Sequence, residues 1–415
     1  MNTKKINIFL STFLFCLPFI GYQLATSLFL QDSAMMEDEM ISSRSVTVPY
    51  RAFVLGLSII MLMVNIKKKF FKNKDIVIFL VFWGLLLIRI FYDLEYQTEH
   101  PVNKMMARQT WLFVLFICLT PTLAVIKSMD CIDLKLAFIL ILFGYVFLIP
   151  VFYINNPLLF STEGIGRISG NLALNTISFG HWGGALSLLS FFAYKNSKKL
   201  LFKVFFIGLM IIGFFVLLRA GSRGPLVAFG ASMLFYYSSR QKHVVLSMIV
   251  MVMLLTLLYV FGDFLFDFIR SVSPVLAKRL TLSSDIASSY EEFSNGRASL
   301  YSIAIENIIN NPILGSSFAV FREYGSYIYS HNIILDAFMG LGFFGGILFL
   351  IILFKALAKS WDLIKERSPY FWLGLLAVQQ IVAHMFSGAF YQSDILNVLL
   401  VVLFVIPTPS KQLSN

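Results

Sequence analysis

Four arginines occupy segments whose composition suits the binding of an anion. Arg219 and Arg223 lie in the segment Arg-Ala-Gly-Ser-Arg-Gly-Pro, Arg297 follows Asn-Gly, and Arg167 lies in Gly-Arg-Ile-Ser-Gly. Arginine suits phosphate because its planar guanidinium can donate two parallel hydrogen bonds. The glycines and the proline around Arg223 would bring the backbone close to a ligand at the start of a helix, where free N–H groups favour an anion. These segments therefore indicate a phosphate-bearing ligand.

A histidine is placed where it could act as a base. His331 lies in Ser-His-Asn-Ile-Ile-Leu-Asp at the start of an apolar run, and imidazole can accept a proton near neutral pH. Asp336 or Glu323 could act as the base instead. His181 and His384 lie within apolar runs, where polar side chains more often hydrogen-bond between helices, so we leave both outside the expected site.

The same residues could have structural functions instead of chemical ones. Some of the arginines could anchor the protein at the membrane interface or pair with carboxylates such as Glu291, Glu292 and Glu323. His331 could cap or anchor the end of a helix. The sequence contains no Walker-type phosphate loop, no HExxH, no EF-hand and no paired Cys/His spacing, so neither a metal site nor a cofactor is expected. The three cysteines lie in or beside apolar runs, and no disulfide is expected.

The composition places the elements that carry these residues in a membrane. Of the 415 residues, 58% are hydrophobic and 13% are charged, whereas soluble domains contain about 25% charged residues. Apolar runs near the ~20 residues needed to span a bilayer recur along the whole chain. The net charge of +11 comes from short basic clusters between these runs, so it indicates topology and not nucleic-acid binding. Residues 1–415 therefore form a single integral membrane domain.

The expected fold class is all-α: a polytopic membrane protein with about 12 transmembrane helices. The predicted spans are 6–29, 51–66, 75–93, 109–126, 134–154, 172–194, 201–219, 225–238, 244–263, 332–356, 369–388 and 394–407. Lysine and arginine are retained in excess in cytoplasmic loops. Most of the 33 lysines and arginines fall on the cytoplasmic side if the N-terminus is cytoplasmic, so both termini are predicted to be cytoplasmic.

With this orientation, the long polar segments lie on the outer face. One is the loop 31–50, and the other is the periplasmic loop 264–330 between the ninth and tenth spans. Within the second loop, apolar residues over 264–280 recur at helical spacing, which predicts an amphipathic segment broken near Pro274. A second short helix is predicted from Arg297 through Ile309, capped by Ser294 or Asn295.

Five segments in this order resemble the O-antigen polymerase and ligase superfamily. They are Leu218-Arg-Ala-Gly-Ser-Arg-Gly-Pro225, Asn295-Gly-Arg-Ala-Ser-Leu-Tyr301, Asn311-Pro-Ile-Leu-Gly315, Ser330-His-Asn-Ile-Ile-Leu335 and Gly340-Leu-Gly-Phe-Phe-Gly345. The stretch from Arg167 to Asn175 is similar to an upstream segment of the same family. The resemblance, together with the number of helices and the long loop, extends over nearly the whole chain.

The resemblance implies transfer of a glycan from undecaprenyl pyrophosphate to a sugar hydroxyl, with inversion and without a metal or cofactor. It assigns the catalytic set to Arg223, Arg297 and His331. The arginines would stabilise the departing pyrophosphate, and His331 would be the base for the acceptor hydroxyl. The residues expected to bind the pyrophosphate or the glycan are Arg219, Arg167, Asn332 and Tyr301.

Three activities fit a protein of this kind. The short interval from Arg297 to His331 and the Asn311–Gly315 element favour an O-antigen or related surface-polysaccharide polymerase over a ligase that transfers the glycan to lipid A-core. A lipid-linked oligosaccharide flippase is more distant, since Arg89 is the main cation within a span and no half-repeat of a transporter is visible. The expected location is the bacterial inner membrane, with the active site facing the periplasm. Expected partners are the lipid-linked substrate, membrane lipid, and a chain-length regulator and flippase of the same lipopolysaccharide or polysaccharide pathway.

Overall fold

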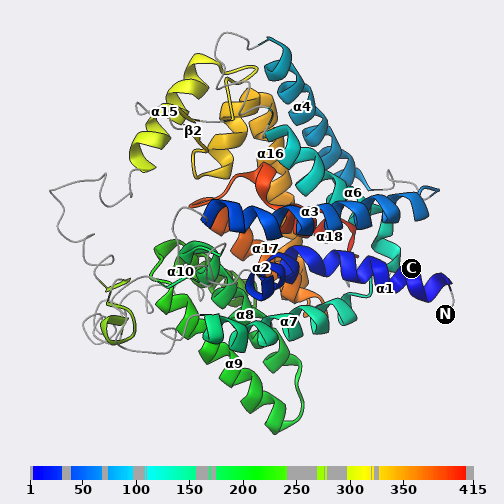
Figure 1. The fold of residues 1–415 in the computed structure, drawn as a ribbon, viewed down its shortest axis with the longest axis vertical. Helices are drawn as coiled ribbons and strands as arrows, with labels where there is room; N and C mark the ends of the chain where they lie inside the picture. The colour runs from blue at the N-terminus through cyan, green and yellow to red at the C-terminus, as the bar shows by residue number, and fades with distance from the viewer. Residues whose placement is uncertain are drawn as a thin grey trace.

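The computed structural model shows an assembly of packed helices (Figure 1). The described residues are 3–29, 39–67, 73–96, 108, 110–155, 168–169, 174–240, 269–274, 276–277, 297–318, 320–321 and 327–407. In this part of the chain every regular element is helical except one pair of two-residue strands.

The elements follow one another in a simple order. The first half contains α1 (Thr3–Cys16), the π-helical η1 (Leu17–Gly21), α2 (Tyr22–Phe29), α3 (Glu39–Val64), α4 (Lys74–Tyr96), the π-helical η3 (Phe113–Leu119), α6 (Thr120–Ser128), η4 (Met129–Cys131), α7 (Leu134–Asn155) and α8 (Thr176–Asn196). The second half contains α9 (Leu200–Arg219), α10 (Arg223–Arg240), α15 (Arg297–Asn310), β1 (Val320–Phe321), β2 (Tyr327–Ile328), α16 (Ile333–Lys365), α17 (Phe371–His384), η6 (Phe390–Gln392) and α18 (Asp394–Val405).

The predicted class, a polytopic all-α membrane protein, is confirmed. Seven helical stretches of the described residues are long and apolar enough to cross a membrane: Lys4–Phe29, Ser45–Val64, Lys74–Glu95, Thr110–Cys131, Leu134–Asn155, Leu200–Arg219 and Ile333–Lys365. Helices α17 and α18 are apolar but shorter. The predicted span 244–263 lies outside the described residues, and every other predicted span coincides with a helix. The number of about 12 spans is not confirmed and stays a prediction.

The predicted outer loop 31–50 is wrong over its second half. Helix α3 begins at Glu39 and continues through Pro49 into the apolar span, so residues 39–50 are helical. A polar composition does not prevent a helix from extending beyond the hydrocarbon region, because backbone hydrogen bonding is local. The apolar pattern therefore located the span but not the start of the helix.

Helices α8 and α9 pack through small residues, which explains why α8 is less apolar than its neighbours. A Cβ atom on Gly183 would lie 2.6 Å from the carbonyl oxygen of Gly213, so only glycine permits this approach of the two backbones. Ser187 Oγ also donates to the carbonyl oxygen of Met210 at 2.9 Å. Most side chains of α8 are buried by neighbouring helices and need no lipid-like surface.

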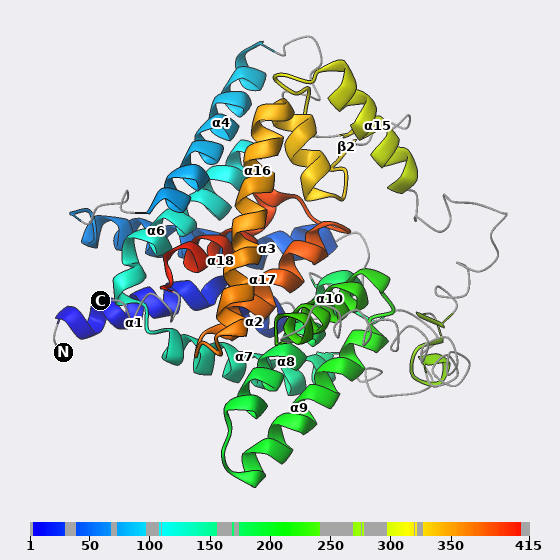
Figure 2. The same cartoon turned by 180° about the vertical axis from the view of Figure 1, so that it is seen from behind.

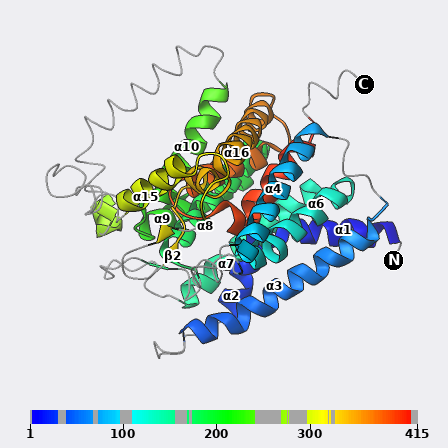
Figure 3. The same ribbon diagram turned by 90° about the horizontal axis from the view of Figure 1, so that it is seen from above.

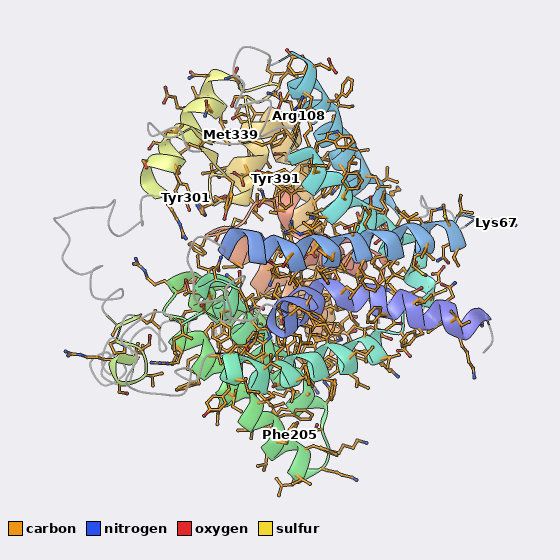
Figure 4. The ribbon with its side chains drawn as sticks, viewed as in Figure 1. Lys67, Arg108, Phe205, Tyr301, Met339 and Tyr391 are labelled. Atoms are coloured by element: carbon orange, nitrogen blue, oxygen red, sulfur yellow. The ribbon has the colours of Figure 1, made fainter. Side chains whose placement is uncertain are left out.

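Helix α9, in contrast, has large apolar side chains exposed on its outer side. Its large apolar side chains Leu200, Leu201, Val204 and Ile211 are between 59% and 77% exposed. Figure 4 shows Phe205, another of these residues, at the edge of the molecule. Such a surface would be unstable in water, so this side of α9 faces lipid.

Several long helices lie side by side. Figures 1 and 3 show α3 running next to α1, and the two helices are in contact. In Figure 1, α1 and α7 run towards the left while α3 runs in the opposite direction, so the C-terminal ends of α1 and α7 and the N-terminal end of α3 lie on one side. The predicted orientation requires these ends to share one face of the membrane.

The predicted loop helix is confirmed as α15, which begins at Arg297 and ends at Asn310 before Pro312. Its side chains Leu300 and Ala304 are buried against Met339 of α16 and Val320 of β1. Figure 4 places Met339 where α15 meets α16. Of the predicted amphipathic segment 264–280, only 269–274 and 276–277 are described, and 269–272 is helical. The loop 264–330 as a unit stays a prediction.

Candidate functional site

The site is built around the turn that precedes α16. Asn332 caps this helix, because its side-chain oxygen accepts hydrogen bonds from the N–H groups of Ile334 and Leu335 at 3.0 and 3.2 Å. Ser330 donates its backbone N–H to Asp336 Oδ1 at 2.9 Å and its hydroxyl to the carbonyl of Asn332 at 3.0 Å. Between them, His331 is held at φ 63°, in the left-handed region that residues other than glycine rarely adopt.

Two of the predicted residues, Asp336 and Asn332, use side-chain oxygens in hydrogen bonds that form this turn. Asp336 is completely buried, and one of its oxygens fixes the turn, so its position is that of an anchor and not of an accessible base. The oxygen of Asn332 is used by the helix cap. Glu323, the other alternative base, lies outside the described residues.

A cavity of about 490 Å³ lies beside this turn. The ring of His331 packs on the ring of Tyr329, with centroids 4.3 Å apart, and Tyr329 is part of the cavity wall. The aromatic side chains of the wall are Tyr22, Tyr50, Phe116, Tyr145, Trp182 and Tyr329. Its uncharged polar side chains include Gln23, Asn175, Ser178, Gln380, Gln392 and Ser393. The volume is within the ~300–1,000 Å³ typical of small-molecule sites.

Two charged residues of the cavity wall were not predicted. Arg51 of α3 and Asp394 of α18 both line it, and the Arg51 guanidinium also lies 5.1 Å from the centroid of the Phe113 ring. Each residue opens a predicted span, 51–66 or 394–407, at its outer end. That shared position was the available signal, but the sequence does not show that the two spans reach the same cavity.

Two histidines that we left outside the expected site also line this cavity. His384 Nδ1 lies 2.7 Å from the carbonyl oxygen of Gln380, so Nδ1 carries the proton and Nε2 is the acceptor of the neutral ring. The ring nitrogens of His181 are buried and have no hydrogen-bond partner among the described residues. Gly388 has φ 114° and lies against the ring of His384, where an added Cβ would be 2.6 Å from Cδ2. Both histidines are therefore candidates for substrate contact.

The turn between α9 and α10, together with the first residues of α10, packs against the same region. A Cβ on Gly180 would lie 2.8 Å from Pro225 Cγ, and a Cβ on Gly224 would lie 3.6 Å from the Cβ of Phe386. Gly180 precedes His181 and Phe386 precedes Ser387, so the turn lies behind two parts of the cavity wall. The half-buried Arg223 is the first residue of α10, where free backbone N–H groups favour an anion.

Arg219 has a structural contact. Its side chain is buried, and Nη1 donates to the carbonyl oxygen of Val272 at 3.0 Å. Arg219 therefore ties the described segment 269–277 to the end of α9. A function in pyrophosphate binding stays a prediction for this residue.

Arg297 and Tyr301 lie at the start of α15. Figure 4 shows Tyr301 at the end of α15 that is farther from α4, and Figure 2 shows this end on the side of α10. Both side chains are partly buried. Neither they nor Arg219 and Arg223 are among the residues that line the cavity. Arg167 lies outside the described residues.

The opposite end of α15 is fixed by Arg89, the main cation within a predicted span and the one that a flippase would need on its path. Arg89 Nε donates to Asp93 Oδ1 at 2.8 Å, and Nη1 donates to the carbonyl oxygens of Leu314 and Gly315 at 2.7 and 2.9 Å. Nη2 donates to the carbonyl oxygen of Ser316. Arg89 is thus buried against the backbone that follows α15 and lines no part of the cavity.

Among the described residues, no group of three or more His, Cys, Asp or Glu side chains is arranged to hold a metal ion. The cavity instead offers aromatic rings, amides, hydroxyls and one charge of each sign. This set suits a polar organic ligand with an apolar face.

Comparison with known proteins finds one family match, over the centre of the chain. Residues 208–350 match the family described as O-antigen ligase. This stretch runs from α9 into α16 and contains Arg219, Arg223, Arg297 and His331. No curated protein and no solved structure matches the chain. The match over residues 208–350 supports the resemblance to the O-antigen polymerase and ligase superfamily.

Proposed function

We propose that this protein is a surface-polysaccharide polymerase that joins lipid-linked oligosaccharide units on the periplasmic face of the bacterial inner membrane. The observation that carries this proposal is the fixed His331 turn, which stands beside a cavity with an aromatic and polar wall. The family match supports a glycosyl-transfer enzyme acting on lipid-linked glycans.

His331 acts as the base in the proposed reaction. It removes the proton from an acceptor sugar hydroxyl, whose oxygen attacks the anomeric carbon of the donor sugar. The bond from that carbon to the pyrophosphate oxygen breaks, and undecaprenyl pyrophosphate leaves with the electron pair. Attack opposite the leaving group inverts the anomeric configuration.

Arg223 and Arg297 stabilise the pyrophosphate as its charge increases. Pyrophosphate is a good leaving group and needs positive charge more than a proton donor, and pre-organised cations can supply a large part of such catalysis. Arg223 adds the N–H groups at the start of α10 to this environment. Arg219, at the end of α9, is itself fixed by its bond to Val272.

The ligase is the second candidate, because the matched family is described as O-antigen ligase. Both enzymes use the same donor, and they differ in the acceptor. A polymerase transfers the growing chain to another lipid-linked unit, whereas a ligase transfers it to lipid A-core. The compact packing of α15 on α16, over the short interval from Arg297 to His331, supports the polymerase.

One assay separates these activities. Purified protein is incubated with an undecaprenyl-pyrophosphoryl oligosaccharide, with and without lipid A-core, and the products are resolved by mass. A ladder of longer lipid-linked glycans without lipid A-core supports the polymerase. Transfer to lipid A-core without a ladder establishes the ligase, and the absence of both products contradicts the proposed function.

A further inference from the structure

The cavity wall carries more hydrogen-bonding groups than the protein itself uses. Trp182 Nε1, Gln23 Oε1 and the ring nitrogens of His181 are buried and have no hydrogen-bond partner among the described residues. All three side chains belong to the cavity wall. A buried polar group without a partner costs roughly 1–3 kcal/mol, so such a cluster indicates a ligand that supplies the partners.

The two charges on the wall favour a neutral ligand over a pyrophosphate. Arg51 would attract it, but the carboxylate of Asp394 lines the same cavity and would repel it. Guanidinium and carboxylate groups together serve a neutral ligand well, because one donates and the other accepts hydrogen bonds. Sugar hydroxyls both donate and accept, and they match this pair.

The aromatic side chains of the wall suit the apolar C–H groups of a sugar. Tyr145 and Trp182 stack on each other with their ring planes 4° apart, which fixes both rings in the wall. Tyr22 and Tyr50 form a second, edge-to-face pair in the same wall. Rings of this kind offer flat apolar surface with a polar edge. A pyranose has the complementary pattern, with C–H groups on its faces and hydroxyls around its rim.

The position of Tyr329 indicates whether the cavity would hold the donor or the acceptor sugar. Tyr329 links the cavity to His331, the proposed base, and the hydroxyl that His331 deprotonates belongs to the acceptor. The arginines proposed for the donor pyrophosphate lie outside the cavity lining. The cavity is therefore on the acceptor side of the reacting bond.

The cavity is also largely separate from the family segment. Of its lining residues, Tyr329 alone lies within residues 208–350, and the others come from α2, α3, η3, α7, α8, α17, α18 and the segments next to them. The residues proposed for the reaction and the residues that line the cavity therefore lie in different parts of the chain, so one set can change without the other. This arrangement suits a common reaction with a sugar-specific acceptor site.

We propose that this cavity binds the acceptor saccharide, with Gln23, Arg51, His181, Trp182 and Asp394 as the residues that determine which sugar is extended. This inference rests on the proposed function, because it requires an acceptor sugar. It assigns sugar recognition to side chains outside the arginine and His331 set.

The test uses the free oligosaccharide released by mild acid from lipid-linked repeat units of the source bacterium. Its binding to the purified full-length protein in nanodiscs is measured by calorimetry. We expect the wild type to bind it, and undecaprenyl pyrophosphate without sugar not to displace it. Failure of the wild type to bind, or displacement by the lipid pyrophosphate, would overturn the assignment.

Matched variants locate the binding. Trp182→Phe removes the indole N–H and keeps a ring, and Gln23→Leu removes the amide and keeps the size of the side chain. Each should weaken binding about 3- to 10-fold, as expected for one lost hydrogen bond. Trp83→Phe is the control, because Trp83 Nε1 is likewise buried without a partner among the described residues but lies outside the cavity. Equal weakening by Trp83→Phe would contradict the proposal.

The extension assay separates this inference from the proposed function. The Gln23→Leu, Trp182→Phe double variant should show a higher KM for the acceptor, while its melting temperature confirms folding. Extension with an unchanged acceptor KM would refute the cavity assignment and leave the enzyme activity intact. If the oligosaccharide binds to the cavity but no lipid-linked glycan is ever extended, the proposed function fails and sugar binding stands.

Discussion

The backbone of His331 has a conformation that most residues avoid. Its φ of 63° is maintained by the hydrogen bonds of Ser330, Asn332 and Asp336, which define the turn on both sides. Backbone strain of this kind costs roughly 1–3 kcal/mol and is often found at functional sites. Since the turn is fixed by its neighbours, the imidazole can be replaced without removing the contacts that shape the turn.

His331→Gly should therefore abolish glycan extension while the protein remains folded. Glycine adopts positive φ without strain, so the melting temperature should be equal to or above that of the wild type. Loss of a general base should lower the rate by roughly 100- to 10,000-fold. His331→Asn, which also tolerates this conformation, should behave in the same way. Activity within a few-fold of wild type in both variants would remove His331 from the reaction.

Arg223 and Arg219 should differ in what their loss affects. Arg223→Ala should remove activity with little change in melting temperature, because the residue is partly exposed at the start of α10. Arg219→Ala should lower the free energy of unfolding by roughly 1–3 kcal/mol, because it loses a charged hydrogen bond to Val272. Arg270→Ala changes an exposed arginine near the same segment and should affect neither quantity. Equal effects of all three variants on activity would contradict a specific function for Arg223.

At the scale of elements, two of the family's segments meet through their backbones. Phe343 donates its N–H to the carbonyl of Pro312 at 2.7 Å, and Ser316 donates to the carbonyl of Met339 at 2.7 Å. These contacts are possible because α16 is interrupted at Gly342, which has φ 64° and ψ −166°. The Asn311–Gly315 element therefore docks into a break in the helix, and this docking positions α15.

Gly342→Ala should disrupt this docking. A Cβ atom there would overlap the carbonyl oxygen of Ile313, and alanine is also strained at this φ. We expect a loss of stability of about 3 kcal/mol or more, measured as a lower melting temperature in detergent. Gly208→Ala in α9 is the matched control, since nothing lies within 4 Å of its added Cβ. It should leave the melting temperature unchanged or raise it, because alanine favours a helix over glycine.

Arg89 should hold α15 from its C-terminal end. Arg89→Leu leaves the carboxylate of Asp93 buried without its ion-pair partner, so it should destabilise the protein by roughly 3–5 kcal/mol. Adding Asp93→Leu should restore much of the stability, whereas the carbonyls of Leu314 and Gly315 stay without their donor. Limited proteolysis after α15 should then remain faster than in the wild type. Wild-type cleavage rates in both variants would show that Arg89 does not fix this segment.

At the scale of the molecule, the sequence predicted the helices better than the site. Apolar runs locate spans because a bilayer demands about 20 such residues, and the basic clusters between them suggest an orientation. The break at Gly342 was not predicted, since glycine in an apolar run shows no need for an interruption until Ile313 lies against it. The cavity could not be predicted either. Its charges, Arg51 and Asp394, are separated by most of the chain and line one cavity only after α3 and α18 have packed into the bundle.

His331 and the family segment could be identified from the sequence because their residues are close along the chain. The hydrogen bonds that shape the turn from Ser330 to Asp336 all join residues of this short segment. His181 and His384 were left out because a histidine within an apolar run usually pairs with another helix. The structure places both on a cavity wall instead.

The most direct test of the central claim is the release of undecaprenyl pyrophosphate during glycan extension by the purified protein. Mass spectrometry of the lipid fraction counts this product, and gel analysis counts the new glycosidic bonds. The account predicts one lipid pyrophosphate released per bond formed, with both products absent in Arg223→Ala and His331→Gly and normal in Arg270→Ala. Extension without stoichiometric release, or release that survives in both active-site variants, would contradict it.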